Sequence, residues 1–183
     1  AERFGCECMI YMHANVSQAR QEAVEAFGAT VIRVDGNYDD SVRQADLDAK
    51  ENGWHIVSDT SYPGYMEVPR DVMAGYTLMT TEAMDQLPES VIPSHVFIQG
   101  GCGGLAGAVC ADLWFRYGKD MPHIVVVEPV PAACLYESAK AGEERIVNIT
   151  EEGLMAGLSC GEVSALGWEI LHAGARHFTT ISD

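Results

Sequence analysis

Apolar runs typical of buried strands alternate along the chain with segments whose apolar positions recur at helical spacing. The strands that this pattern predicts are Cys8–Met12, Thr30–Val34, His55–Val57, His95–Gln99 and His123–Glu128. The helices that it predicts are Ser17–Phe27, Asn37–Asn52, Val68–Leu87, Leu105–Tyr117, Pro131–Ala141 and Ala165–Ala175. The final residues, HFTTISD, show no closing element. Strands that alternate with helices predict an α/β fold in which helices cover both faces of parallel sheets.

A shift in composition near Gly53–Ser58 marks the predicted domain boundary. We expect residues 1–57 and residues 58–183 to belong to different domains, because few contacts cross such a polar, glycine-containing linker. The chain has no initiator methionine, and its first apolar run reads as a strand inside a fold. We therefore expect the sequence to be a fragment of a longer protein.

Acidic residues outnumber basic ones: the 183 residues include 27 Asp and Glu against 11 Lys and Arg, which gives a formal net charge of −16. Nucleic acids and anionic membrane surfaces require clustered basic side chains, so both are excluded as partners. No apolar run reaches the roughly 18 residues of a membrane span. The six cysteines are too sparse for a secreted disulfide scaffold, and neither they nor the six histidines show metal-ligand spacing. We expect a cytoplasmic protein without a metal.

The segment FIQGGCGGLAG places four glycines in the five positions 100–104, between a predicted strand and a predicted helix. Glycine allows positive φ angles and lets a ligand approach the backbone without a Cβ in the way. The first N–H groups of a helix have no intrahelical partner and attract anions. The segment therefore predicts a phosphate site formed by Gly101, Cys102, Gly103 and Gly104.

Two phosphate ligands are compatible with this loop. The residues GCGGLA fit the loose dinucleotide pattern, and Glu128 ends the next strand, where an acid that binds ribose would lie. This alternative predicts an NAD(P)-dependent oxidoreductase. Several strand–helix units precede the loop, however, whereas a dinucleotide fingerprint usually opens its domain.

The order strand, GGCGG, LAG and helix resembles the phosphate loop of fold type II pyridoxal-phosphate (PLP) enzymes, the tryptophan synthase β/threonine dehydratase group. Further segments resemble the diaminopropionate ammonia-lyase family within that group, in family order over nearly the whole chain. These segments are YMHANVSQAR, FGATVIRVDGNYDDSVR, ENGWHIVSDTSYPGY, VPRDVMAGY, VVVEP and MAGLSCGEVSALGWEIL.

The resemblance implies an incomplete fold type II enzyme, with residues 1–57 in its small domain and residues 58–183 in its large domain. It implies PLP as the cofactor, which acts as an electron sink. The implied reaction is the α,β-elimination of 2,3-diaminopropionate, an amino acid substrate, to pyruvate and ammonia. The full-length protein is expected to be a homodimer.

The resemblance also implies roles for individual residues. Asp59, in SDTSYPGY, matches an active-site aspartate that binds the second amine of the substrate or assists proton transfer. Gly161 and Glu162 match a loop near the cofactor ring, in addition to the phosphate-binding residues Gly101, Cys102, Gly103 and Gly104. Cys134 and Cys160 occupy positions at which the family has cysteines and are a candidate disulfide pair.

The lysine that binds PLP in this family is expected upstream of this chain. Lys50, Lys119 and Lys140 lie in or beside polar helices, so none is predicted to be that lysine. We expect the 183-residue chain alone to be inactive. Another fold type II amino acid dehydratase or lyase, and an α/β module that has lost its chemistry, remain alternatives.

Overall fold

The computed structural model describes residues 1–88, 91–150 and 153–182, and it divides the chain into two compact units, Ala1–Ile56 and Val57–Asp183. The first unit contains η1 (Glu2–Phe4), β1 (Met9–His13), α1 (Gln18–Glu25), β2 (Thr30–Val34) and α2 (Tyr38–Asn52). The second contains α3 (Glu67–Asp85), β3 (His95–Gln99), α4 (Gly104–Tyr117), η2 (Gly118–Asp120), β4 (His123–Pro129), η3 (Val130–Ala132), α5 (Cys134–Ala141), η4 (Ala156–Leu158), α6 (Ala165–Gly174) and β5 (His177–Ile181).

In the first unit, β1 and β2 form a parallel pair that runs in register from Met9 opposite Thr30 to His13 opposite Val34. Helix α2 begins with a capping box: the Asn37 side chain accepts a hydrogen bond from the Asp40 N–H, and the Asp40 carboxylate accepts one from the Asn37 N–H. Such reciprocal bonds satisfy two of the N–H groups that a helix start leaves without partners.

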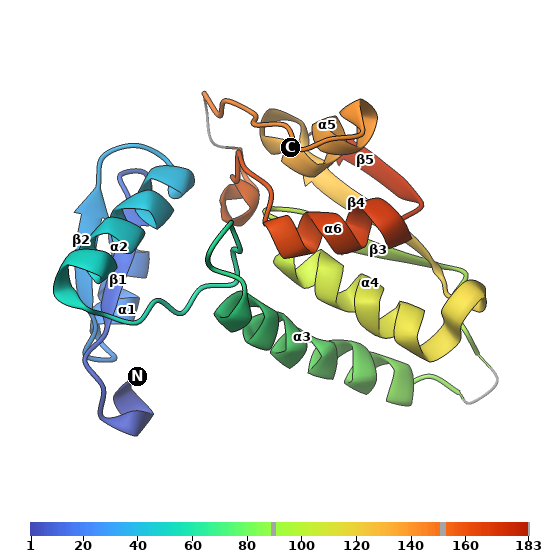
Figure 1. Ribbon diagram of the computed structural model, residues 1–183, viewed down its shortest axis with the longest axis horizontal. Helices are drawn as coiled ribbons and strands as arrows, with labels where there is room; N and C mark the ends of the chain where they lie inside the picture. Colours follow the sequence, from blue (N-terminus) through green and yellow to red (C-terminus); the bar gives the residue numbers. More distant parts are fainter. Residues whose placement is uncertain (89–90, 151–152, 183) are drawn as a thin grey trace. The chain divides into compact units, whose positions relative to one another are not determined.

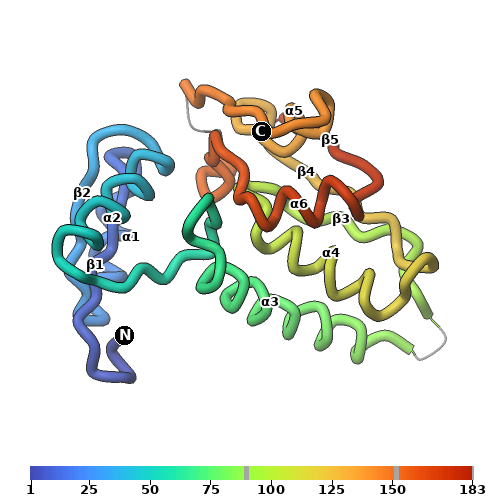
Figure 2. Tube along the Cα trace, in the orientation of Figure 1, coloured from blue at the N-terminus to red at the C-terminus, as the bar shows by residue number. Residues whose placement is uncertain are grey.

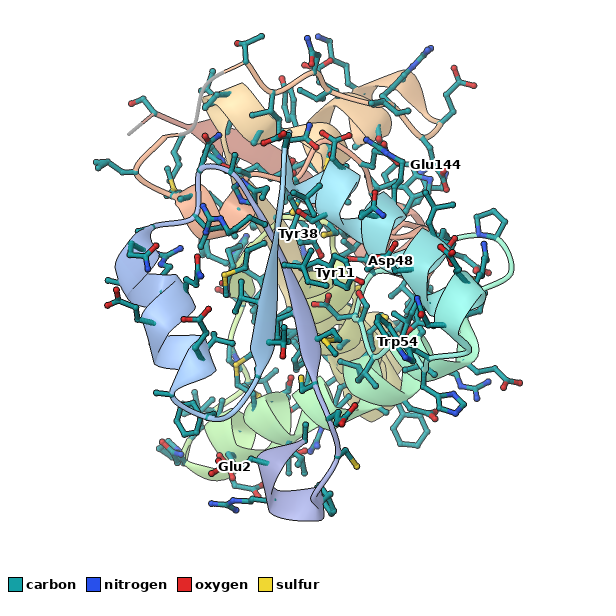
Figure 3. The ribbon with its side chains drawn as sticks, turned by 90° about the vertical axis from the view of Figure 1, so that its left-hand side faces the viewer. Glu2, Tyr11, Tyr38, Asp48, Trp54 and Glu144 are labelled. Carbon is teal, nitrogen blue, oxygen red and sulfur yellow. The ribbon has the colours of Figure 1, made fainter. Side chains whose placement is uncertain are left out.

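A polar contact joins α2 to β1. The Tyr11 hydroxyl donates a hydrogen bond of 2.6 Å to Oδ2 of Asp48, and Figure 3 shows the two side chains next to one another. Burial and the Asp48 carboxylate raise the pKa of Tyr11 to about 12. The hydroxyl therefore remains a proton donor to this carboxylate at neutral pH.

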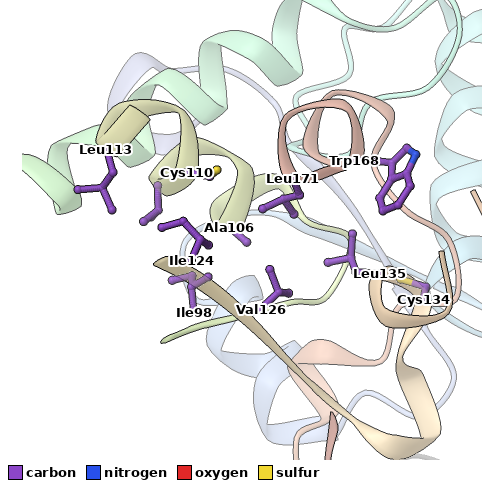
Figure 4. Packing of buried hydrophobic residues seen from close by; sticks show 11 residues of the cluster. Ile98, Ala106, Cys110, Leu113, Ile124, Val126, Cys134, Leu135, Trp168 and Leu171 are labelled. Atoms are coloured by element: carbon purple, nitrogen blue, oxygen red, sulfur yellow. The ribbon is translucent and has the colours of Figure 1, made fainter. Parts of the chain in front are cut away.

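The second unit is built on a three-stranded parallel sheet in the order β3-β4-β5. Helix α4 packs beside both α3 and α6, as Figure 1 shows. Side chains from the sheet and from α4, α5 and α6 meet in one apolar cluster (Figure 4). Its buried members are Ile98, Ala106, Val109, Cys110, Leu113, Ile124, Val126, Cys134, Leu135, Trp168 and Leu171.

Glycines allow α4 and α6 to approach within backbone contact. A Cβ on Gly107 would lie 3.0 Å from the Gly167 Cα, and a Cβ on Gly167 would lie 2.6 Å from the Gly103 carbonyl oxygen. Real Cβ atoms do not tolerate the shorter distance, so glycine is required at position 167. This contact fixes the start of α4, and with it the end of the glycine loop, against α6.

The structure confirms the predicted α/β class with parallel sheets, but it corrects three elements. No strand forms at His55–Val57, because this exposed connection between the units finds no neighbouring strand among the described residues. The end of the chain, for which we expected no element, forms β5 and pairs with β4 from Val125 opposite His177 onward (Figure 2). Helix α5 begins at Cys134 because Val130–Ala132 form a separate 3₁₀ turn.

None of the helices in residues 1–88, 91–150 and 153–182 is both long and apolar enough to cross a membrane.

Candidate functional site

The glycine loop follows β3 and leads directly into α4. The Gly100 N–H donates to the Val127 carbonyl oxygen at 2.8 Å, so the loop begins as a continuation of the sheet. Gly101 and Gly103 then adopt φ angles of 74° and 100°, which other residues rarely adopt. These two positive φ angles turn the chain so that the helix starts at Gly104.

The loop is also too tightly packed for side chains on its glycines. A Cβ on Gly100 would overlap the Glu128 Cγ, and one on Gly103 would lie 3.2 Å from a Leu135 methyl group. A Cβ on Gly104 would lie 3.2 Å from the Asp59 carbonyl oxygen. The loop is therefore a close-packed backbone turn whose shape is set by β4, α5 and the Asp59 segment.

This turn presents the positive end of a helix dipole. Helix α4 has 14 residues, and its first N–H groups have no carbonyl partner within the helix. Gly103, the N-cap residue, has no side chain that could cap them. Backbone N–H groups at such a helix start form an anion site suited to a phosphate group. The geometry thus fits the phosphate-binding role predicted for Gly101, Cys102, Gly103 and Gly104.

Asp59 lies beside this helix start. Besides its carbonyl oxygen, its Oδ2 atom would be 3.6 Å from a Cβ on Gly104. The Tyr76 hydroxyl, in α3, donates a hydrogen bond of 3.0 Å to the same Oδ2 atom. The structure therefore brings the predicted catalytic carboxylate next to the predicted phosphate cradle.

Two buried serines that sequence reasoning did not single out hold these segments together. The hydroxyls of Ser61 and Ser164 lie 2.8 Å apart, and the Ser61 N–H donates to the Ser164 hydroxyl at 2.9 Å. The Ser164 N–H donates to the Cys102 carbonyl oxygen at 2.7 Å. The Leu166 N–H, at the start of α6, donates to the Ser61 hydroxyl at 2.8 Å. We call Ser61 and Ser164 the serine clasp, because they tie the Asp59 segment, the glycine loop and α6 together.

Three thiols lie close to the loop. The Cys102 thiol donates to the Cys160 sulfur at 3.2 Å, and the Cys134 thiol donates to the Gly101 carbonyl oxygen at 3.4 Å. None of the six cysteines, all of which lie in the described ranges, is part of a disulfide. The candidate Cys134–Cys160 bond is therefore not formed, and the sulfur found beside Cys160 belongs to Cys102.

The segment that contains Gly161 and Glu162 follows directly after Cys160 and so begins at the glycine loop. Gly161 is buried, and its carbonyl oxygen accepts a hydrogen bond of 2.9 Å from the Val147 N–H. Glu162 is partly buried. Their predicted contacts with a cofactor ring remain predictions.

Glu128 does not occupy a position suited to binding a ribose. Its side chain is 1% exposed, and its carboxylate oxygens accept hydrogen bonds from the N–H groups of Leu135 (3.1 Å) and Tyr136 (2.7 Å) at the start of α5. Burial raises the pKa of Glu128 to about 7, although these N–H groups oppose the shift. A buried carboxylate that already accepts hydrogen bonds from the start of α5 is not accessible to a ribose hydroxyl. The structure therefore argues against the alternative of an NAD(P)-dependent oxidoreductase.

Fold and glycine loop together define a class of protein. Residues 1–183 match the family described as pyridoxal-phosphate dependent enzymes, and the chain belongs to this family. The predicted fold type II class and the predicted cofactor, PLP, are thereby confirmed.

Individual relatives narrow the similarity. The chain is 40% identical over 186 residues to the diaminopropionate ammonia-lyase of Escherichia coli, covering 100% of this chain and 46% of that protein. A probable D-serine dehydratase of Pseudomonas aeruginosa is 26% identical over 191 residues, covering 98% of this chain and 41% of the relative. The resemblance to the diaminopropionate ammonia-lyase family is confirmed, and the chain spans about half the length of these curated relatives.

Solved structures agree with the sequence relatives. Escherichia coli diaminopropionate ammonia lyase in complex with an aminoacrylate-PLP azomethine reaction intermediate has a TM-score of 0.92 at 38% identity, covering 100% of this chain and 46% of that chain. Threonine deaminase isoform 2 from Solanum lycopersicum, at 22% identity and covering 99% of this chain and 49% of that chain, has a TM-score of 0.78 and shows the shared fold alone.

Proposed function

We propose that this chain contributes the phosphate cradle and the acidic residue of a PLP-dependent carbon–nitrogen lyase that converts 2,3-diaminopropionate to pyruvate and ammonia. The observation that carries the proposal is the Asp59 carboxylate beside the start of α4, in a chain 40% identical to a diaminopropionate ammonia-lyase. A substrate with two amino groups needs an anionic partner next to the cofactor, and Asp59 supplies one.

The cradle fits the phosphate of PLP. Positive φ angles at Gly101 and Gly103 expose the backbone, and the N–H groups at the start of α4 can donate to phosphate oxygens. No lysine or arginine is required for this, because the helix dipole and the N–H groups supply the positive potential. When bound, PLP supplies the electron sink for carbanion chemistry at the substrate α-carbon.

Asp59 has the chemistry that the elimination needs from the protein. An ionised carboxylate accepts hydrogen bonds from an ammonium group and can take up a proton from it or from carbon. Tyr76 holds one carboxylate oxygen in place, and among the described residues the other oxygen, Oδ1, has no hydrogen-bond partner. We assign to Asp59 the binding of the substrate's second amine or the transfer of its proton.

None of the chain's three lysines fits the PLP-binding role. Lys50 pairs with Asp46 and Lys140 with Glu137, each on an exposed helix surface, while Lys119 is exposed in η2. We propose that a lysine outside this sequence binds PLP. The proposal also includes contacts of Gly161 and Glu162 with the cofactor ring. It assigns residues 1–57 to the small domain and residues 58–183 to the large domain of a cytoplasmic, homodimeric enzyme.

The test is to express the complete reading frame that contains this sequence, together with the 183-residue chain alone. We expect the complete protein to show the visible absorbance of bound PLP and to release pyruvate from 2,3-diaminopropionate, whereas the chain alone releases none. PLP absorbance without pyruvate would keep the cofactor and overturn the substrate, and threonine and the two serine enantiomers would then be assayed. Turnover by the chain alone would contradict the assignment of the PLP lysine.

A further inference from the structure

Tyr76 was not among the site residues that the sequence predicted, yet it contacts the predicted catalytic carboxylate directly. It lies near the middle of α3, and its hydroxyl donates to Oδ2 of Asp59 at 3.0 Å. Helix α3 packs along α4, the helix that starts at the glycine loop. Tyr76 is therefore held in a fixed position relative to that loop.

The backbone of Asp59 is fixed independently of this contact. Its carbonyl oxygen lies against Gly104 and accepts a hydrogen bond of 3.5 Å from the Ser164 hydroxyl of the serine clasp. Because the Asp59 backbone is fixed in this way, the hydrogen bond from the Tyr76 hydroxyl sets the orientation of the carboxylate group. It engages Oδ2 and leaves Oδ1 for a ligand.

The protonation state of Tyr76 is defined as well. Burial and the nearby Asp59 charge raise the pKa of Tyr76 to about 12, so its hydroxyl stays protonated and can only donate to an ionised carboxylate. A donor to the charged form of a carboxyl group favours that form. The other titratable groups around the pair are Tyr65, whose hydroxyl accepts from the Ser58 N–H, and Cys102 of the glycine loop.

From this geometry we propose that Tyr76 is the positioning residue of the acidic group: its hydrogen bond orients the Asp59 carboxylate beside the phosphate cradle. The inference rests on the proposed function for the role of Asp59 in catalysis, but the hydrogen bond and the orientation that it gives the carboxylate are independent of the substrate. A tyrosine that merely fills space in α3 would be replaced by phenylalanine without any effect on Asp59.

The test compares Tyr76→Phe with a matched control, Tyr117→Phe, in the complete PLP-loaded protein. Tyr117 lies at the far end of α4 and packs against the apolar cluster, so the control removes the same atom away from the site. The first readout needs no substrate: the ¹³C carboxylate chemical shift of Asp59 at one fixed pH in aspartate-labelled protein, with the signal assigned by Asp59→Asn. We expect this signal to move in Tyr76→Phe, because the carboxylate loses its hydrogen-bond donor, and to stay unchanged in Tyr117→Phe.

The second readout is the separate change in kcat and in KM for pyruvate release. Because Tyr76→Phe leaves the Asp59 carboxylate present but no longer oriented, it should lower kcat by at least about tenfold with a smaller change in KM, whereas Tyr117→Phe should change neither. An unchanged Asp59 signal in Tyr76→Phe, or an equal change of that signal in Tyr117→Phe, would overturn the inference. Wild-type protein that releases no pyruvate would overturn the proposed function instead, while the Asp59 NMR signal would still decide the role of Tyr76.

Discussion

The two units of the chain differ in the interactions that stabilise each of them internally. In residues 1–56 the only buried apolar residue is Ala49, which is 7% exposed, and this unit relies on one strand pair, the capping box of α2 and the Tyr11–Asp48 contact. In the second unit, side chains from the three-stranded sheet and from α4, α5 and α6 share an apolar core that includes the fully buried Leu113 and Leu171. A two-stranded sheet with little apolar burial is marginally stable, whereas helices packed on a larger sheet form an independent core.

The location of the chemistry follows this difference. The glycine loop, Asp59 and Tyr76 all lie in the second unit, and the core supports them through Leu135, Gly167 and the neighbouring helices. Binding groups must be held within fractions of an ångström, and rigid, well-packed elements achieve this better than lightly packed ones. We therefore expect changes in the second unit to have larger effects than matched changes in the first.

Truncation of a leucine side chain should give the largest difference in stability loss between the two units. Leu113 is 0% exposed in the second unit and Leu47 is 60% exposed in the first. We expect Leu113→Ala to lower the free energy of unfolding by about 2–5 kcal/mol, because it leaves a cavity. Leu47→Ala should change it by less than about 0.5 kcal/mol. Urea unfolding with hydrogen exchange resolved by unit measures both, and equal losses would contradict the comparison.

The pH dependence should have opposite signs in the two units. The pKa of Glu128 is raised from 4.5 to about 7, so between these values the folded state holds a proton that the unfolded state has lost. The second unit should therefore lose stability as pH rises through this interval, by up to about 3 kcal/mol. Hydrogen exchange of the second unit at several pH values measures this slope, and Glu128→Gln should remove it.

Asp40 provides the contrast in the first unit. The Asn37 N–H, together with Arg43, lowers the pKa of Asp40 from 3.8. Its contribution is therefore present above that value and is lost as pH falls through the lowered pKa. Asp40→Asn should weaken the acid dependence of exchange in α2 and leave the slope caused by Glu128 intact. The same slope in both units would show that Glu128 is not its source.

Alanine at two glycines with positive φ should separate backbone strain from packing. Gly28, with φ 80°, has open space where a Cβ would be, whereas a Cβ on Gly103, with φ 100°, meets Leu135 and Leu171. We expect Gly28→Ala to cost about 1 kcal/mol for the φ angle alone. Gly103→Ala should cost about 2 kcal/mol and also weaken PLP binding, because overpacking adds to the strain. Thermal unfolding measures the loss of stability, and PLP titration measures the loss of binding. An equal loss of stability in the two variants would show that the glycine loop relaxes to accommodate the added methyl group.

Loss of a single polar contact should have the smallest effect. Tyr11→Phe removes the hydrogen bond to Asp48 and should destabilise the first unit by about 1 kcal/mol. Hydrogen exchange in β1 and α2 should rise, while exchange in α4 and the binding of PLP stay unchanged. Faster exchange in α4 would show that the two units do not respond independently.

Local signals were sufficient to predict much of the fold. Strands β2 and β3 have the bounds that their apolar runs predicted, and α2 lies between the Asn37 and Gly53 caps. The positive φ angles of the glycine loop likewise followed from its composition. These features depend on neighbouring residues, so the sequence alone contains their causes.

The features that were missed depend on residues far apart in the chain. Strand β5 is short and mostly part-exposed, so its Phe, Thr and Ile content was the only available signal, while His55–Val57 carried a strand-like pattern without a partner to pair with. The roles of Tyr76 and the serine clasp arise only when α3, the glycine loop and α6 meet. No local pattern of tyrosine or serine distinguishes such residues from ordinary ones on a helix or in a turn.

The serine clasp also has a consequence for the order of folding. Ser61 and Ser164 are 103 positions apart, and the Cys102 carbonyl of the glycine loop accepts its hydrogen bond from the later of the two. A chain emerging from the ribosome can therefore form β3, the loop and α4 well before the support of that loop has been synthesised. Contacts between distant residues close late, because the chain entropy of the long loop must be overcome first. The cofactor should thus be captured only after α6 has docked, so that uptake of PLP reports the completion of folding rather than its start.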